Sequence, residues 1–209
     1  MTPLIVKHAL PALLLIIVMS LLQMFATTLT PALEYNRSLI IQGEVWRLFT
    51  AYWIHTNHWH FLMNTMAFGI ILLLHGMYSS VQRFAFNLIV GSSLISIMLL
   101  LAFPEQQQFV GLSGWLHAIL IWGACIDIQR HLSSGWLILL GVVGKVIWEQ
   151  MHGASANLAV LIDANVAIDT HLLGVISGFV LYLTTLVYQK LCSTTPRPKP
   201  ILQEARRSD

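Results

Sequence analysis

The sequence predicts an all-α fold: a polytopic membrane protein with a bundle of six transmembrane helices. Of the 209 residues, 56% are hydrophobic and only 10% are charged, whereas soluble domains average about 25% charged residues. Apolar runs of roughly 20 residues, long enough to cross a bilayer, can be placed six times. No stretch has the alternating pattern of a β-strand.

The six predicted spans differ in length. They cover about residues 9–29, 58–77, 84–103, 113–129, 134–149 and 169–189. The fourth and fifth are short for a complete crossing. The first lies where a signal peptide would, but its apolar stretch is too long and lacks a clear small-residue cleavage site. We therefore expect it to be a retained helix.

The basic residues of the loops indicate the orientation of the spans. One side carries Lys7, Arg83, Arg130, Lys190, Arg197, Lys199, Arg206 and Arg207. The other side carries Arg37 and Arg47 together with Glu34, Glu44, Glu105, Asp163 and Asp169. The basic side is expected to be cytoplasmic, with both termini inside. The net charge of +2 then reflects topology, and we expect no nucleic-acid partner.

The chain is predicted to form one membrane domain, residues 1–192, followed by a disordered basic cytoplasmic tail, residues 193–209. Two outer loops, 30–57 and 150–168, connect the spans. The two cysteines, Cys125 and Cys192, are placed unsuitably for a disulfide and are too few for a structural zinc site.

Ser113 begins the fourth predicted span, within Gly111-Leu112-Ser113-Gly114. A helix from Ser113 to Gln129 would be about 25 Å long, which is shorter than the roughly 30 Å hydrocarbon core. The fourth span is therefore too short to start at the outer surface. We expect Ser113 several ångströms below it, in protein or in a water-filled cavity.

His171 begins the sixth predicted span and is the candidate partner of this serine. His171, Gly174 and Gly178 fall on one helical stripe, and Gly114 and Ala118 offer small residues on the fourth span. Small residues let helices approach closely. A hydroxyl and an imidazole in contact are a nucleophile and its base. Since no acidic residue is clearly placed to orient the imidazole, we expect a catalytic dyad.

Other polar side chains begin spans at a similar depth. His60 and Asn64 are spaced i and i+4 at the start of the second span. Their side chains, together with the backbone amide of Ser113 at a helix start, are candidate donors to the oxyanion of a tetrahedral intermediate. Gly111 and Leu112 are assigned to the same oxyanion and substrate-binding site.

The remaining polar residues leave alternatives open. His117 lies one turn deeper on the serine's face and can bond across the bundle or support the oxyanion site. Lys145 and Glu149, spaced i and i+4, are expected to form a structural ion pair. His55 and His58 are assigned to the outer loop. Because no carboxylate joins these loop histidines at ligand spacing, we expect neither a metal nor another cofactor.

These residues together resemble the rhomboid family of intramembrane serine proteases, from about Gly43 to Gly178. The matching motifs are Trp46-Arg47, His55, His60, Asn64, Gly111-Leu112-Ser113-Gly114, and His171 with Gly174 and Gly178. The resemblance implies that Ser113 is the nucleophile and His171 the general base. It also implies that His60 and Asn64 bind the oxyanion.

Two stretches are similar to the rhombosortase branch of this family. They are Gly-Leu-Ser-Gly-Trp-Leu-His at 111–117 and Lys-Val-Ile-Trp-Glu-Gln at 145–150. The similarity implies a protease of the Gram-negative bacterial inner membrane. It would cleave exported proteins at a C-terminal sorting tail with a Gly-Gly-type motif, one transmembrane helix and a basic cluster.

The expected function is thus cleavage of transmembrane protein substrates near the outer face of the bilayer. The alternatives are a general rhomboid protease, a non-catalytic rhomboid-like protein that binds membrane segments, and a small transporter. Loss of the serine or histidine would favour the second, and an inverted repeat would favour the third; neither is found. Ser113 as a simple helix N-cap is a further alternative. Transfer to a nucleophile other than water and the oligomeric state stay open.

Overall fold

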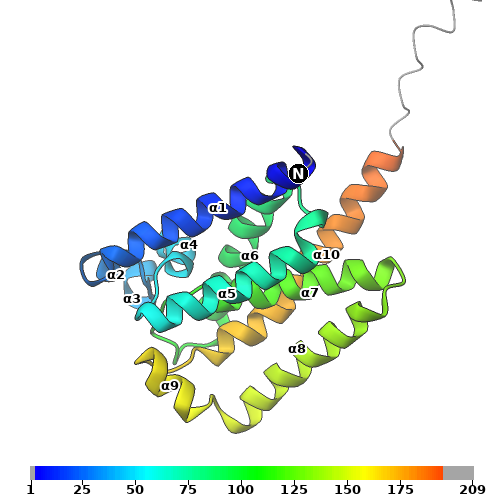
Figure 1. Ribbon diagram of the computed structural model, residues 1–209. Helices are drawn as coiled ribbons and strands as arrows, with labels where there is room; N and C mark the ends of the chain where they lie inside the picture. Colours follow the sequence, from blue (N-terminus) through cyan, green and yellow to red (C-terminus); the bar gives the residue numbers. More distant parts are fainter. Residues whose placement is uncertain (1–2, 195–209) are drawn as a thin grey trace, which may run out of the picture.

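The computed structural model describes residues 3–194, and the side chains of residues 10–191. Its six long helices follow the order of the predicted spans (Figure 1). They are α1 (Pro3–Met24), α5 (His58–His75), α6 (Val81–Ala102), α7 (Ser113–Gln129), α8 (Ser133–His152) and α10 (Ile168–Thr194). The predicted helical membrane bundle is therefore confirmed. The predicted tail lies, from residue 195 onward, outside the described residues.

Among the described residues, three stretches are long and apolar enough to cross a membrane on their own: His58–Tyr78, Val81–Ala102 and Ile168–Leu191. The first includes the short helix η2 (Gly76–Tyr78) that extends α5. Leu10–Met24 of α1 and α2 (Ala26–Leu33) meet at 109° and together make a fourth candidate. α7 has only 17 residues, in line with the expectation that this span is short.

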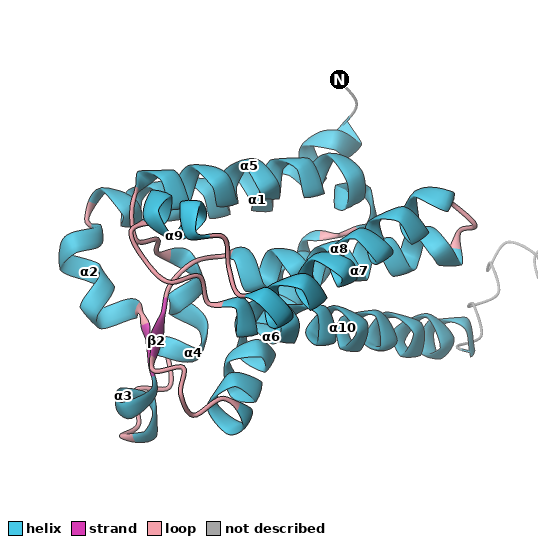
Figure 2. Cartoon of the chain, turned by 90° about the horizontal axis from the view of Figure 1, so that it is seen from below, coloured by secondary structure: helices cyan, strands magenta, loops and turns pink. Residues whose placement is uncertain are grey.

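The outer loop before α5 folds into short elements at the end of the bundle where α7 begins (Figure 2). These are β1 (Tyr35–Asn36), α3 (Arg37–Ile41), α4 (Arg47–Thr50) and η1 (Ala51–Trp53). β1 pairs antiparallel with β2 (Gln108–Phe109), which lies just before α7. These strands were not predicted, because two residues are too few for an alternating pattern.

Arg47 stabilises this outer segment through hydrogen bonds to two other residues of it. Its side chain is buried, and its Nε donates to Glu44 Oε2 at 2.7 Å. Its Nη1 donates to the Glu34 carbonyl at 3.0 Å. The neighbouring Trp46 stays half exposed and donates to the Ala32 carbonyl, consistent with the interfacial position expected of an amphipathic aromatic residue.

α7 is the central helix, and α5, α6, α8 and α10 pack around it. Most of its side chains are buried, among them Trp115 and Trp122. Trp115 Nε1 donates to the Asn87 carbonyl at 2.9 Å, and Trp122 Nε1 donates to Thr185 Oγ1 at 3.0 Å. A helix that is apolar around its whole circumference is typical of such a central position.

The contact between α7 and α10 is close enough to require glycine. A Cβ on Gly178 would lie 2.5 Å from the Ala118 carbonyl oxygen. A Cβ on Gly174 would overlap the Gly114 carbonyl oxygen. The small residues predicted to let the fourth and sixth spans approach do meet, and they bring the starts of the two helices together.

The far end of the bundle is held by a buried polar cluster around Asp127 of α7. The Tyr78 hydroxyl donates to Asp127 Oδ1 at 2.6 Å, and His75 Nε2 lies 3.2 Å from Oδ2. The His75 ring occupies the space that a side chain at Gly123 would need. Asp127 thus lies at the end of α7 away from Ser113.

Gly178→Val should destabilise the fold, because the added side chain meets the α7 backbone. We expect a loss of roughly 3 kcal/mol, typical of overpacking against backbone. Gly141→Ala is the matched control, since nothing lies within 4 Å of a Cβ at Gly141. Thermal unfolding in detergent measures both, and equal melting temperatures would contradict the proposed role of this contact.

Candidate active site

The turn before α7 fixes the position of Ser113. Gly111 has a φ of +118°, a backbone conformation that favours glycine. Its N–H donates to the Ala51 carbonyl at 2.9 Å. Leu112, not Ser113, is the N-cap residue, and Ser113 is the first residue of α7. The serine is therefore not a helix cap, and its hydroxyl is available for another partner.

That partner is His171. The Ser113 Oγ lies 2.9 Å from His171 Nε2, although the two residues are 58 positions apart in the sequence. His171 is buried in the first turn of α10. The structure thus brings together the hydroxyl and the imidazole that the sequence analysis paired.

A third residue, Glu149 of α8, completes the arrangement. Its Oε2 lies 2.9 Å from His171 Nδ1, on the side of the ring away from the serine. The expected dyad therefore missed an acidic partner. Asp169, the acid nearest to His171 in sequence, is not among the imidazole's hydrogen-bond partners in the described part of the chain.

The hydrogen bonds define the tautomer of His171. An ionised carboxylate only accepts, so His171 Nδ1 carries the proton and donates it to Glu149. In the neutral ring, Nε2 then has a free lone pair. The Ser113 hydroxyl donates to that lone pair. This is the tautomer that a general base needs in order to take a proton from the serine.

Lys145 and His117 also belong to this cluster, and both contact the His171 ring. The Lys145 ammonium lies 2.8 Å from both carboxylate oxygens of Glu149 and 3.2 Å from His117 Nε2. His117 Nδ1 donates to the Ser113 carbonyl at 2.7 Å. The His117 ring stacks on the His171 ring, with centroids 4.3 Å apart. The His117 ring and the Lys145–Glu149 ion pair thus both contact the His171 ring.

This cluster contains ligand atoms spaced as a metal site requires. One atom each from His117, Glu149 and His171 lies within 4.8 Å of the others. The Lys145 ammonium, however, already lies against Glu149 and His117. A divalent cation placed among these atoms would meet a positive charge a few ångströms away. The donor set therefore fits the ammonium better than a metal ion.

Asn64 and His60 of α5 lie against the turn that precedes Ser113. A Cβ on Gly111 would lie 2.6 Å from His60 Nε2 and 3.5 Å from Asn64 Nδ2. Asn64 is buried, and its Nδ2 has no hydrogen-bond partner among the described residues. An unpaired buried amide costs free energy, so this donor can bind a further group that reaches the turn before Ser113.

The hydrogen bonds of His60 differ from those of Asn64. The Thr56 hydroxyl donates to the Ile162 carbonyl at 2.6 Å, and its oxygen lies 3.1 Å from His60 Nδ1. Since the single hydroxyl proton is already used, His60 Nδ1 must be the donor. Nε2 of a neutral ring is then an acceptor and cannot donate to an oxyanion.

His55 is buried behind His60, with ring centroids 5.0 Å apart. It lies in the outer loop, as expected from the sequence, between η1 and α5. Its ring, however, points inward. Neither ring nitrogen has a hydrogen-bond partner among the described residues. Burial and the His60 ring lower the pKa of His55 to about 3.

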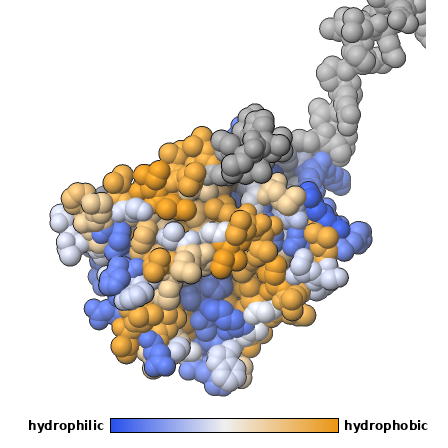
Figure 3. Space-filling model, viewed as in Figure 1, coloured by the Kyte–Doolittle hydropathy of each residue, from blue (hydrophilic) through white to orange (hydrophobic). Residues whose placement is uncertain are grey.

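Two cavities meet at Ser113. One, of about 360 Å³, lies between α5, α7 and α8 and is lined by apolar side chains together with His171 and Lys145. The other, of about 720 Å³, is lined by polar loop residues such as Glu105 and Gln106 and lies toward the outer segments. The space-filling view shows a hydrophilic area between α8 and α9 (Ala156–Ile162) within a largely hydrophobic surface (Figure 3).

The fold and the site define a polytopic helical membrane protein in which Ser113 and His171 are hydrogen-bonded near one end of the bundle. A comparison with protein families matches the rhomboid domain over residues 42–188, more than half of the chain. The chain therefore belongs to the rhomboid family of intramembrane serine proteases, which act on transmembrane substrates in a bilayer. No curated protein matches the chain.

The depressed pKa of His55 predicts that the fold loses stability as the pH falls. The unfolded chain binds a proton below about pH 6.5, whereas folded His55 stays neutral down to about pH 3. The difference is about 2 kcal/mol at pH 5. We expect His55→Leu to reduce the drop in melting temperature between pH 7.5 and pH 5.

His58→Gln is the control for this measurement, because His58 is exposed at the start of α5. It should leave the pH dependence of the melting temperature unchanged. A His55→Leu protein with the same pH dependence as the wild type would show that His55 is protonated in the folded state.

Proposed function

We propose that the protein is an intramembrane serine endopeptidase in which Ser113, His171 and Glu149 act as a catalytic triad. The observation that carries the proposal is the chain of two hydrogen bonds, each 2.9 Å long, from Ser113 Oγ through the imidazole to Glu149. A bare helix cap or a packing histidine would not need this chain.

In the proposed reaction, Ser113 Oγ attacks the substrate's carbonyl carbon while His171 Nε2 takes the hydroxyl proton. Glu149 stabilises the imidazolium that forms. The imidazolium then gives its proton to the leaving amine, and an acyl-enzyme remains. Water, activated by the same imidazole, releases the acyl group and restores the serine.

Two donors are proposed for the oxyanion of the tetrahedral intermediates. Asn64 Nδ2 is buried and unpaired among the described residues. The Ser113 backbone N–H lies at the start of α7, where no intrahelical acceptor is available. The Gly111 N–H is already bonded to Ala51, so we assign Gly111 a shaping role. Removal of one such donor commonly costs about 10²–10³ in rate.

The two cavities suit a substrate and water arriving from different directions. The apolar cavity between α5 and α8 would receive an unwound transmembrane segment from the lipid. The polar cavity on the other side of Ser113 would supply water.

For the substrate class, we propose the rhombosortase-like activity, cleavage of C-terminal Gly-Gly-type sorting tails. The residues that carry this similarity are in contact: His117, Lys145 and Glu149 all lie against His171. With this proposal go a bacterial inner-membrane location and cytoplasmic termini. A general rhomboid protease and a non-catalytic membrane-segment binder are the alternatives.

A fluorophosphonate probe should label the wild-type protein and fail to label Ser113→Ala. A protein with a sorting tail, reconstituted with the enzyme in liposomes, should be cleaved by the wild type only. Cleavage of unrelated transmembrane segments with no preference for the sorting tail would favour a general rhomboid. Normal cleavage by Ser113→Ala would end the serine protease proposal.

Glu149→Gln should lower kcat by about 10²–10⁴ with little change in KM. The glutamine amide donates to Nδ1 and so favours the wrong tautomer of His171, an effect known from triad proteases. His152→Gln, one turn away on exposed α8 surface, is the control and should keep full activity. If Glu149→Gln retains the wild-type kcat, then Ser113 and His171 act without an acidic partner.

A further inference from the structure

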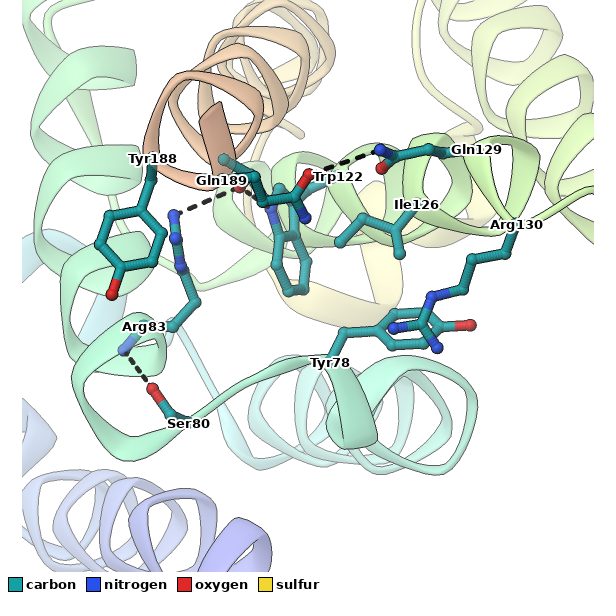
Figure 4. Close-up of a pocket in the computed structure, with 10 residues that line it drawn as sticks. Tyr78, Ser80, Arg83, Trp122, Ile126, Gln129, Arg130, Tyr188 and Gln189 are labelled. Carbon is teal, nitrogen blue, oxygen red and sulfur yellow. Dashed lines mark hydrogen bonds between the residues drawn. The ribbon is translucent and has the colours of Figure 1, made fainter. Parts of the chain in front are cut away.

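A basic cavity of about 440 Å³ lies at the end of the bundle opposite Ser113 (Figure 4). The segment joining α5 to α6 and the ends of α7 and α10 form its walls. Its lining residues are mainly polar: Tyr78, Ser80, Arg83, Gln129, Arg130, Thr185, Tyr188 and Gln189, with Trp122 and Ile126 at the back. None of the lining residues is an acid.

Two guanidinium groups give this cavity its charge. Arg83 Nη1 donates to Thr185 Oγ1 at 3.2 Å, and the group lies 5.1 Å from the Tyr188 ring centroid. The Arg130 guanidinium lies 4.4 Å from the Tyr78 ring centroid (Figure 4). Both side chains are held by neutral groups rather than by carboxylates.

Neither guanidinium is paired directly with a carboxylate in the described part of the chain. The nearest buried acid, Asp127, is bonded to Tyr78 and His75 instead. Guanidinium groups without a carboxylate are suited to a bidentate bond with an oxyanion such as phosphate.

An apolar groove of about 660 Å³ continues from this cavity along α6 and α10. Ser80, Arg83 and Tyr188 line both spaces, so the polar and apolar parts adjoin. The remaining groove is lined mostly by exposed apolar side chains: Phe86, Val180, Leu183, Val187 and Leu191. A ligand that fills both spaces must have an anionic head and an apolar tail.

We propose that this composite site binds an anionic phospholipid of the surrounding membrane. The phosphate would lie in the basic cavity against Arg83, which also lines the groove, and Arg130 would add positive charge to the same cavity. An acyl chain would lie in the groove between α6 and α10. Basic pockets between transmembrane helices are known to take such headgroups. A free phosphate would leave the adjoining groove unused, and a zwitterionic lipid would meet the guanidiniums with a second positive charge.

Binding at this position would link three segments of the bundle. The site joins the α5–α6 connection to the ends of α7 and α10. A ligand that binds only the folded state stabilises it by mass action. The lipid is therefore expected to raise the melting temperature of the protein.

The test uses the purified full chain in detergent, with native mass spectrometry and thermal unfolding as the readouts. Phosphatidylglycerol should bind at least about tenfold more tightly than phosphatidylethanolamine of the same chains, a difference of about 1.4 kcal/mol. The double variant Arg83→Gln/Arg130→Gln should lose this preference. Lys190→Gln removes a positive charge from exposed α10 surface outside the cavity and should keep it.

Leu183→Asp tests the site independently in case the double variant fails to fold. Leu183 is exposed in the groove, so its replacement is not expected to disturb the core. It should also weaken phosphatidylglycerol binding, whereas glycerol phosphate at the same concentration should fail to displace the lipid. Equal binding of both lipids would overturn the proposal. So would displacement by glycerol phosphate, or an equal loss in Lys190→Gln.

Discussion

The close packing of α7 against α10 is the constraint on which the site depends. Backbone carbonyls of α7 lie where side chains at Gly174 and Gly178 would otherwise stand. This contact brings the first turns of the two helices together and sets the 2.9 Å separation of Ser113 Oγ and His171 Nε2. Because both side chains extend from helices rather than loops, their relative position is rigid, which favours a precise reaction geometry.

The charges around His171 are balanced before any substrate arrives. Glu149 Oε2 contacts both the imidazole and the Lys145 ammonium, which lie next to each other. A lone carboxylate at this depth would be costly, and its pairing with lysine lowers that cost. When the imidazole takes a proton during the proposed reaction, Glu149 gains a second positive neighbour. Lys145 therefore stabilises the buried Glu149 carboxylate before the reaction, and Glu149 in turn stabilises the imidazolium that forms during it.

The sequence predicted much of this site because the polar residues begin apolar helices that run in the same direction. His60, Ser113 and His171 each lie in the first turn of α5, α7 or α10, so the topology alone brings them to one end. Glu149 lies near the end of α8, which runs the opposite way, and its partner is 22 residues distant. Because Lys145, four residues earlier, already accounted for the charge of Glu149 as a local ion pair, the sequence did not indicate the hydrogen bond from Glu149 to His171. The orientation of the His60 ring depends on Thr56 and the Ile162 carbonyl, a contact that no spacing rule predicts.

The two cavities that meet at Ser113 have a consequence for inhibitor chemistry. One wall of the space around Ser113, the proposed nucleophile, is apolar and faces the gap between α5 and α8, while the other is polar and faces the outer segments. A compound with an apolar tail, a central electrophile and a hydrophilic leaving group would match both cavities at once. A uniformly lipophilic or uniformly water-soluble compound would match only half of the binding surface. Potency against this protein should therefore follow amphiphilic balance more closely than total size.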